Sequence, residues 1–407
     1  MDYEKRFRRD VVLLIAANII WELGYNMYTG LMSVYISEFT DNVQLIGFMM
    51  SLINILAFTA LIGGALSSKI HTKYIIAFGW IITVPAPLLF MLANSWQMIL
   101  VGQILHWITS ISASCFMLYI FDYPGKGDKM NAYMLCSIGV MIGAMIAPSI
   151  GGIIADRFGM RILFAVVLVL YILSSVCTCL LTPYKKEETA VQAKEEDASA
   201  ASYVGGSRTG IGGPVVLFTV LACAMHFAHS VANPVVSLYL NETRAFSVEM
   251  IGYGFTAFGI GGMLLMAFSK RYDLRIGTGK TLFVLAAVYI CANFGMALTS
   301  AWGLLLAMAL RGAERMLPLY VQGKVAEIVT GKHKGIFLSV YMVVRCFLMA
   351  LASNVGAGMY KTWTYLPFLA EIVLVAVWLA VFFALRSKFD FFAGKPKKNT
   401  EECSEKT

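Results

Sequence analysis

Residues 161–182 read RILFAVVLVLYILSSVCTCLLT, and residues 183–213 continue as PYKKEETAVQAKEEDASAASYVGGSRTGIGG. The first stretch carries no charge after Arg161 and is long enough to cross a hydrocarbon core of about 30 Å. The second is rich in Lys and Glu, then in Gly, and has no apolar run, which is typical of a flexible linker. The pair therefore predicts a membrane helix that ends at a break between two parts of the chain.

The same alternation extends outward over the whole chain. Of its 407 residues 59% are hydrophobic and 14% are charged, against about 25% charged in soluble domains. Twelve apolar segments can be marked: 11–37, 43–66, 74–93, 97–121, 131–155, 161–182, 214–240, 249–269, 281–300, 302–328, 335–360 and 363–386. Because lipid offers no hydrogen bonds to the backbone, each segment is expected to be helical. The sequence predicts an all-α polytopic membrane protein.

Basic residues set the expected orientation. With the N-terminus in the cytoplasm, the inside segments hold 25 of the 32 Lys and Arg residues, as the positive-inside rule requires. We therefore expect a multi-pass protein of the plasma membrane with both termini cytoplasmic. The predicted parts are a terminus (1–10), a six-helix bundle (11–182), a linker (183–213), a second six-helix bundle (214–386) and a tail (387–407).

The two predicted bundles echo each other. Trp96 and Trp302 each open a fourth helix, and Ser68-Lys69 and Ser269-Lys270 each close a second helix. Two six-helix repeats of one orientation are typical of secondary transporters, in which the substrate site lies between the repeats.

Two motifs accompany this plan. Residues 64–73 read GALSSKIHTK, and residues 147–152 read APSIGG, followed by ADRFGMR at 155–161. They resemble conserved motifs of the major facilitator superfamily and, in the second case, of its drug/proton antiporter branch. Ser68 stands where the family usually has Asp, and His71 replaces a Gly. The residues matched as gating or motif positions are Gly64, Ser68, Lys69, Lys73, Pro148, Gly151, Gly152, Asp156 and Arg157.

The resemblance implies twelve helices in two bundles, alternating access, and a cavity lined by helices 1, 4, 7 and 10. Polar residues fall on those helices at three- and four-residue spacing, which places them on one face of each. Together with Arg345 of helix 11, they form the predicted substrate-binding set: Asn18, Tyr25, Asn26, Gln103, His106, His226, Asn233, Arg311, Glu314, Arg315 and Arg345. Glu22, on the same face of helix 1, is expected to be the proton-coupling carboxylate, because intramembrane acids usually mark ion pathways.

Helix 10 carries Arg311, Glu314 and Arg315 within about one turn. One interpretation is a self-satisfied Arg–Glu–Arg cluster that holds the structure together. The other starts from the excess of positive charge, which has to be answered by Glu22 or by an anion on the substrate. Arg311 and His106 occupy corresponding positions of the repeats and are expected to face each other across the cavity. This second interpretation predicts an anionic or zwitterionic amphiphile, and its rival is a neutral or cationic drug.

Other functions are less well supported by the residues. Gly277–Thr281 resembles the end of a P-loop, but Leu274 stands where its first Gly is needed, and the His residues lack zinc-ligand spacing. We therefore expect no cofactor, no metal and no nucleic-acid partner, and a monomer that exchanges a small molecule and protons, as an antiporter or efflux protein. The alternatives are a polytopic membrane enzyme or a transporter-like sensor that acts on a lipid-linked or small-molecule ligand.

Overall fold

The computed structural model describes residues 2–123, 129–184, 212–298, 300–329 and 334–389. Most of the predicted linker and of the predicted tail lie outside these ranges. The regular elements of the described residues are all helical. The first bundle comprises α1 (Asp2–Thr29), α2 (Met32–Ser37), α3 (Val43–Leu56), α4 (Thr59–Leu66), α5 (Thr72–Thr83), α6 (Pro85–Met91), α7 (Trp96–Ile108), η1 (Thr109–Ser112), α8 (Ala113–Phe121), α9 (Lys129–Phe158) and α10 (Met160–Cys179).

The second bundle has the same number of membrane passes as the first. Its elements are α12 (Gly213–His229), η2 (Asn233–Val235), α13 (Val236–Leu238), η3 (Tyr239–Thr243), α14 (Val248–Ile276), α15 (Thr278–Gly295), α16 (Ala301–Arg311), α17 (Ala313–Ile328), α18 (Lys334–Thr362), α19 (Leu366–Ala384) and η4 (Arg386–Lys388). In the described residues, eleven segments are long and apolar enough to cross a membrane. The remaining predicted segment, 302–328, is formed by α16 and α17 and is interrupted at Gly312.

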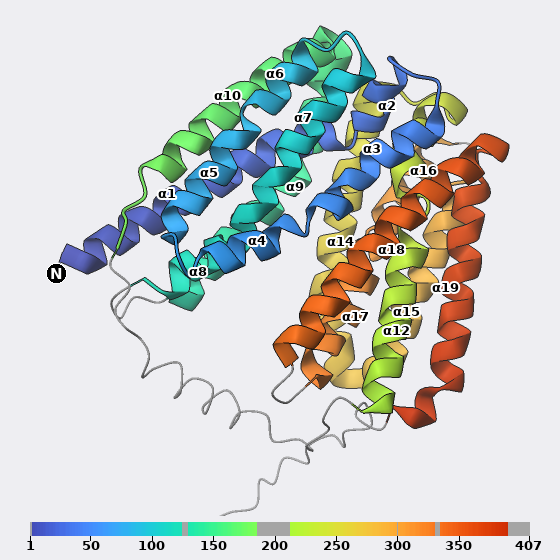
Figure 1. The fold of residues 1–407 in the computed structure, drawn as a ribbon. Helices are drawn as coiled ribbons and strands as arrows, with labels where there is room; N and C mark the ends of the chain where they lie inside the picture. The colour runs from blue at the N-terminus through green and yellow to red at the C-terminus, as the bar shows by residue number, and fades with distance from the viewer. Residues whose placement is uncertain (1, 124–128, 185–211, 299, 330–333, 390–407) are drawn as a thin grey trace, which may run out of the picture.

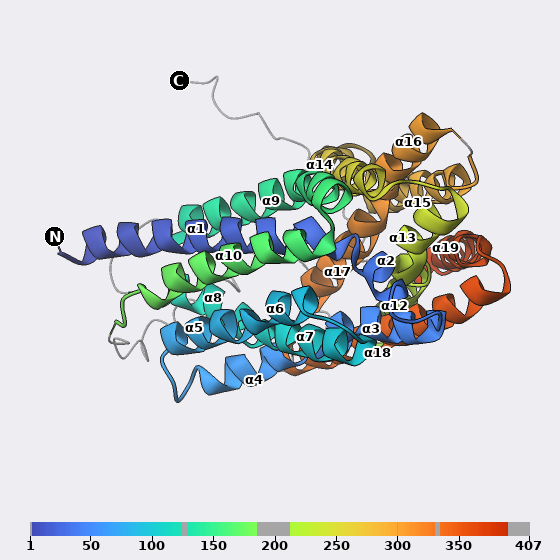
Figure 2. The same cartoon turned by 90° about the horizontal axis from the view of Figure 1, so that it is seen from above.

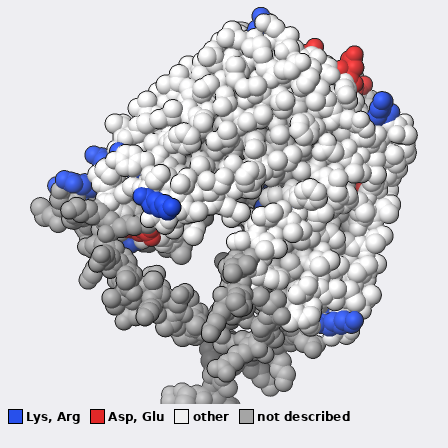
Figure 3. Space-filling view, viewed as in Figure 1, with Lys and Arg blue, Asp and Glu red and all other residues white. Residues whose placement is uncertain are grey.

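The two bundles lie side by side and approach each other most closely at one end (Figure 1). We call the end where α10 finishes and α12 begins the linker end, and the opposite one the far end. Toward the linker end the helices of the two bundles diverge, and the space-filling view shows a hollow there (Figure 3). Between the two ends, the broad face in Figure 3 is almost free of charge, as expected of a surface that faces hydrocarbon, and the charged side chains gather toward the ends.

Small residues close the far end. Helix α9 lies along α14, and α3 lies along α18 (Figure 2). A Cβ atom on Gly252 of α14 would come within 2.5 Å of the Pro148 carbonyl oxygen and 3.0 Å of the Gly152 Cα atom. The Ser149 hydroxyl donates to Thr256 Oγ1 across the same seam at 2.7 Å. Glycine is needed here because the two helix backbones touch.

Within the first bundle, a buried carboxylate joins three elements at the linker end. Asp10 of α1 has no exposed surface. Its Oδ2 accepts hydrogen bonds from the hydroxyls of Tyr119 (2.9 Å) and Tyr123 (3.2 Å), and from the backbone N–H of Thr182 (3.2 Å). The Arg9 guanidinium lies 2.9 Å from Oδ1. Asp10 therefore anchors the end of the first bundle, just before the predicted linker.

Candidate functional site

Three neighbouring cavities lie along the inner faces of the bundles. The central cavity, of about 280 Å³, is lined from both bundles by Tyr25, Asn26, Thr29, Gly30, Ala144, Pro148, His229, Asn233, Phe255, Phe258, Gly259, Glu314 and Arg315. A second, of about 310 Å³, borders Asn18, Glu22 and Trp107, and a third, of about 80 Å³, borders Tyr25, Gln103 and His106. Tyr25 lines both the central and the third cavity, and Trp107 lines both the second and the third, so the three cavities are neighbours. The structure thus brings together most of the polar residues expected on helices 1, 4, 7 and 10.

Glu22 lies on α1 and lines the second cavity, whose described lining residues all belong to the first bundle. Its Oε2 accepts a hydrogen bond of 2.7 Å from the Asn26 side chain, whose Nδ2 also donates to the Glu22 carbonyl at 2.8 Å. Arg315 of the second bundle interacts electrostatically with Glu22 and with Tyr25. A carboxylate of one bundle therefore lies within the field of a guanidinium of the other.

Arg315 extends into the central cavity and is exposed there. Its guanidinium lies 5.9 Å from the ring centre of Phe258, a cation–π contact, and among the described residues no carboxylate lies within ion-pair distance of it. The nearby Glu314 hydrogen-bonds Asn233 and is paired with Arg311. A cation in a low-dielectric cavity without a close anion favours binding of an anionic group.

Arg311 occupies a different place from the one that the sequence predicted. It is 1% exposed and lies inside the second bundle, where it cannot face His106. Its Nε is 2.7 Å from Glu314 Oε2 and its Nη2 is 3.0 Å from Glu371 Oε2, while Nη1 donates to Asn293. The Glu371 side chain also accepts from the Tyr289 hydroxyl (2.6 Å) and the Ala232 N–H (2.8 Å). The Arg311 guanidinium is thus paired with carboxylates of its own bundle.

The break at Gly312 explains this difference. A Cβ on Gly312 would lie 2.2 Å from the backbone nitrogen of Gly262, so α14 passes directly against this position. Around it the backbone forms hydrogen bonds of the 3₁₀ type: the Gly312 N–H donates to the Ala309 carbonyl, and the Arg315 N–H donates to the Gly312 carbonyl. These bonds tighten the helix. Regular four-residue spacing predicts that Arg311 and Arg315 share a face, but in the tightened helix they do not.

His106 belongs to an aromatic cluster of the first bundle. Its ring stacks on Trp21 (5.5 Å between centres) and on Tyr25 (5.3 Å), and it is 2% exposed. Its Nδ1 is 3.3 Å from the Tyr28 hydroxyl and 3.4 Å from the Tyr171 hydroxyl, whereas its Nε2 is buried without a partner. His106 and Arg311 each lie within their own bundle.

The second bundle adds two histidines and an arginine. His226 Nε2 is 2.9 Å from the Tyr341 hydroxyl. His229, which the sequence analysis left out of the binding set, lines the central cavity, and no described residue hydrogen-bonds either of its ring nitrogens. The sequence signal for His229 was its spacing: it lies three residues after His226, which places both on the same side of the helix. Arg345 lies away from the central cavity, and its Nη1 donates to Gln322 Oε1 at 2.5 Å.

The motif residues lie at the two ends of the first bundle. At the linker end, Ser68 Oγ donates to the Ala65 carbonyl at 2.8 Å, Lys69 is exposed, and Lys73 lies over the Tyr74 ring. His71, in place of the family's Gly, accepts from the Lys73 N–H at 3.1 Å and so caps α5.

The remaining motif positions were matched at residues 64 and 147–161. Gly64 faces Ser114 of α8. Gly151 packs directly on α1, since a Cβ there would overlap the Met27 carbonyl oxygen. Asp156 and Arg157 are exposed at the end of α9.

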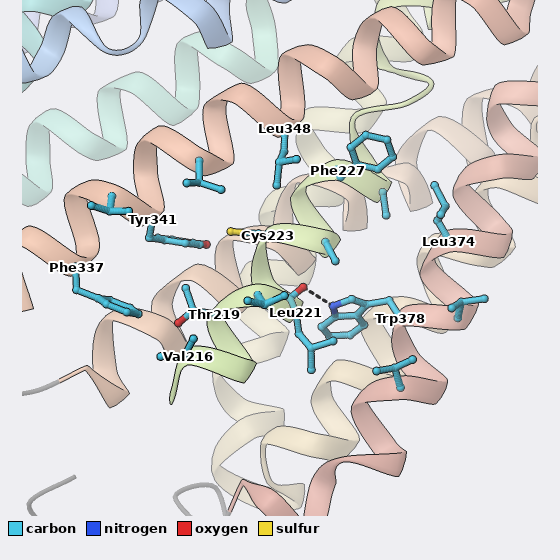
Figure 4. A pocket seen from close by; sticks show the side chains of 17 residues that line it. Val216, Thr219, Leu221, Cys223, Phe227, Phe337, Tyr341, Leu348, Leu374 and Trp378 are labelled. Carbon is cyan, nitrogen blue, oxygen red and sulfur yellow. Dashed lines mark hydrogen bonds between the residues drawn. The ribbon is translucent and has the colours of Figure 1, made fainter. Parts of the chain in front are cut away.

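A cavity larger than these three lies outside this site. A groove of about 620 Å³ lies between α12, α18 and α19, and its wall is almost entirely apolar (Figure 4). Trp378 Nε1 donates to the Leu221 carbonyl at 2.7 Å in this wall. The polar atoms at its border include the Tyr341 hydroxyl, which points to His226. Such a surface is suited to hydrocarbon chains rather than to an ion.

Solved structures of several transporters share this fold. The nucleoside transporter NupG superposes with a TM-score of 0.72 at 12% identity, covering 94% of this chain and 99% of that one. A bacterial homolog of the human lysosomal transporter Spinster, inward-facing and occupied, gives 0.70 at 15% identity, with 93% and 96% covered. A POT family transporter in complex with 5-aminolevulinic acid gives 0.71 at 11% identity, with 96% and 97% covered.

Sequence comparison identifies the family but no close relative. A search of curated proteins found no match. The profile of the Major Facilitator Superfamily, however, matches residues 14–316, which include most of the first bundle and the second through Met316. Together with the two six-helix bundles and the cavity between them, this match assigns the protein to a family of membrane transporters and not of enzymes. The chain belongs to the major facilitator superfamily.

Proposed function

We propose that the protein is a proton-coupled secondary transporter that carries an organic anion or zwitterion through the central cavity by alternating access. The observation that supports this most directly is the exposed Arg315 guanidinium in a cavity between the bundles, with its counter-charge Glu22 on the opposite bundle. Placed by the positive-inside rule, the linker end is cytoplasmic. The conformation described above is then inward-open, in the plasma membrane, with both termini inside.

Coupling follows from competition for one guanidinium. An ionised Glu22 answers Arg315 and lowers its attraction for a substrate anion. A proton that binds Glu22 removes this counter-charge, so that a carboxylate or phosphate of the substrate can pair with Arg315 in its place. Proton and anion then occupy the cavity together. The site that holds both is neutral, like the empty Glu22–Arg315 pair, whereas a site that holds only one of them has a net charge when the bundles move around it. This order favours symport and uptake.

Substrate shape is set by the surroundings of the two charges. Tyr25, Phe255 and Phe258 offer aromatic faces in the central cavity, and Asn26, Asn233 and His229 offer hydrogen-bonding groups. Small-molecule sites typically combine apolar walls with a few placed polar groups in this way. We propose a compact solute with one anionic group, a few polar groups and an apolar part.

Antiport and efflux of a cationic drug form the second candidate. It is favoured by the resemblance of residues 147–161 to the drug/proton antiporter branch and by the position of Glu22 on a cavity wall. In that case the drug cation and the proton compete for Glu22, and Arg315 disfavours the drug.

The experiment compares matched acid and amide ligands. Purified protein is screened by thermal shift against organic carboxylates and their uncharged amides. The acid is expected to stabilise the wild type more strongly, because a charge-assisted hydrogen bond contributes about 1.5–3 kcal/mol, or roughly ten- to hundred-fold in affinity. In Arg315→Gln this preference is expected to vanish. Arg161→Gln, at an exposed Arg in the first turn of α10, is the matched control.

The best acid then enters a transport assay in proteoliposomes. Glu22→Gln is expected to retain counterflow and to lose accumulation driven by an inward proton gradient. Full gradient-driven accumulation by Glu22→Gln contradicts the coupling role. A preference for amines that Glu22→Gln removes and Arg315→Gln leaves intact supports the antiport candidate instead.

A further inference from the structure

A fifth cavity lies at the edge of the seam between the two bundles. It measures about 470 Å³ and is lined by α3, α4 and α8 on one side and by α18 on the other. Along α3 and α18 it follows the contact between Ser51 and Asn354, beyond which the helices diverge toward the linker end. Its volume falls within the range of about 300–1,000 Å³ that small-molecule sites occupy.

The rim of this cavity faces the surrounding bilayer. Phe347 is 68% exposed, and Phe58 and Leu61 are each 47% exposed. In a membrane, such side chains contact hydrocarbon. Among the described residues that line the cavity none is acidic, and most are apolar. The cavity is therefore continuous with the lipid and offers a dry surface to an alkyl chain.

The one charged residue among the described lining residues is Arg345. It lies eight residues inside the span Phe337–Thr362, about 12 Å along the helix axis. Within the described part of the chain its hydrogen-bond partner is Gln322, a neutral amide, and its buried Nε–H has no acceptor. An intramembrane cation is costly unless an anion or water answers it, and the described residues provide Arg345 with no carboxylate.

The residues behind Arg345 do not supply the missing charge. His226 and His229 lie within its electrostatic reach, as do Cys223 and Tyr341. None of these groups is an acid that is ionised at neutral pH. The guanidinium thus combines an unmet need for an anion with an apolar cleft that opens to lipid.

We infer that this cleft is a lateral capture site for an anionic, single-chain amphiphile from the bilayer, with Arg345 binding its carboxylate or phosphate and the apolar rim holding its chain. This inference rests on the proposed transport function, in which the captured molecule continues into the central cavity. Its substrate class is therefore narrower: amphiphilic anions that reach the protein through the membrane and not from water.

The test uses photo-crosslinking in nanodiscs. A diazirine-labelled palmitate and a diazirine-labelled neutral monoacylglycerol are compared, and adducts on residues 54–61 and 338–347 are quantified by mass spectrometry. The palmitate probe is expected to label both stretches, and Arg345→Gln is expected to reduce that labelling by about ten-fold or more. Arg345→Lys is expected to retain much of it, and the monoacylglycerol should label all variants equally. Arg386→Gln, at the exposed linker end, is the control.

Each arm has an outcome that overturns the inference. Equal palmitate labelling of wild type and Arg345→Gln shows that the charge plays no part. Full displacement of palmitate by soluble hexanoate at the same bulk concentration shows that the site takes anions from water. Labelling does not depend on transport, so Glu22→Gln is expected to be labelled like the wild type. Labelling without gradient-driven transport contradicts the proposed function alone, and transport without Arg345-dependent labelling contradicts this inference alone.

Discussion

Replacing Glu371 by Ala should destabilise the second bundle more than any surface carboxylate can. The side chain is fully buried, and its two oxygens accept from Arg311 (3.0 Å), Tyr289 (2.6 Å) and the Ala232 N–H (2.8 Å). These donors come from α16, α15 and the turn after α12, so one carboxylate joins three membrane segments to α19. Glu371→Ala leaves all three donors in a place that water does not reach.

The size of the effect follows from these contacts. Breaking a buried ion pair by removing one partner costs about 3–5 kcal/mol, and each orphaned neutral donor costs about 1–3 kcal/mol. The terms overlap, because Arg311 keeps Glu314 and Asn293. We therefore expect a loss of about 3–5 kcal/mol in the free energy of unfolding. Glu371→Gln keeps an acceptor oxygen and the shape of the side chain, and should cost about 1–2 kcal/mol.

The measurement is equilibrium unfolding in mixed micelles titrated with sodium dodecyl sulfate, followed by tryptophan fluorescence. Glu242→Ala is the matched control, because Glu242 is exposed and accepts a single hydrogen bond from Tyr360. It is expected to cost less than about 1 kcal/mol. If Glu371→Ala and Glu242→Ala unfold within about 1 kcal/mol of each other, the network does not stabilise the bundle and the reasoning is refuted.

Two further predictions concern the seam and the linker end. Gly252→Ala adds a Cβ that would lie 2.5 Å from the Pro148 carbonyl oxygen, so we expect the far end to open more often, seen as a longer distance between spin labels on the far ends of α9 and α14. An unchanged distance distribution would show that the seam tolerates the added atom. Asp10→Ala leaves the donors of Tyr119, Tyr123 and Thr182 without their acceptor, and should cost about 3 kcal/mol or more, in the same unfolding assay. Asp10→Asn, which keeps an acceptor, should cost less, and equal losses in the two variants would contradict the role of the acceptor oxygens.

The fold followed from the sequence because lipid leaves the backbone few choices. An apolar run of about 20 residues must be helical to satisfy its own hydrogen bonds, so the two sets of helices could be read from composition alone. The breaks were harder to place. Pro234 lies at the bend after α12, where proline is a local signal for a helix break, but the interruption of the tenth segment at Gly312 depends on close contact with α14, which no local pattern reveals.

The candidate site was predictable in its membership but not in its geometry. Helical spacing shows which residues share a face, and Tyr25, Asn26 and Asn233 do line one cavity with Arg315, while their part in binding stays a prediction. Spacing does not show how a helix is rotated against its neighbours. Arg311 was therefore assigned to the cavity, whereas its partner Glu371 lies 60 positions further along the chain and on another helix. A pairing of that kind requires the three-dimensional structure.

The placement of the charges bears on how the two bundles move. If the bundles rotate as rigid units, polar contacts within one bundle persist in both states, and contacts across the seam change. Arg311 has its carboxylate partners in its own bundle, so its environment is independent of the motion. Among the described residues Arg315 forms no ion pair: Glu314, which lies within its electrostatic reach, is paired with Arg311, and the other acid that interacts with it is Glu22 on the first bundle.

Of these two arginines, Arg315 is thus the one whose electrostatic energy changes when the bundles separate. A proton on Glu22 or an anion on Arg315 alters that energy directly. Under the proposed coupling, this asymmetry between two neighbouring arginines is what would let a proton gradient act on the conformational equilibrium.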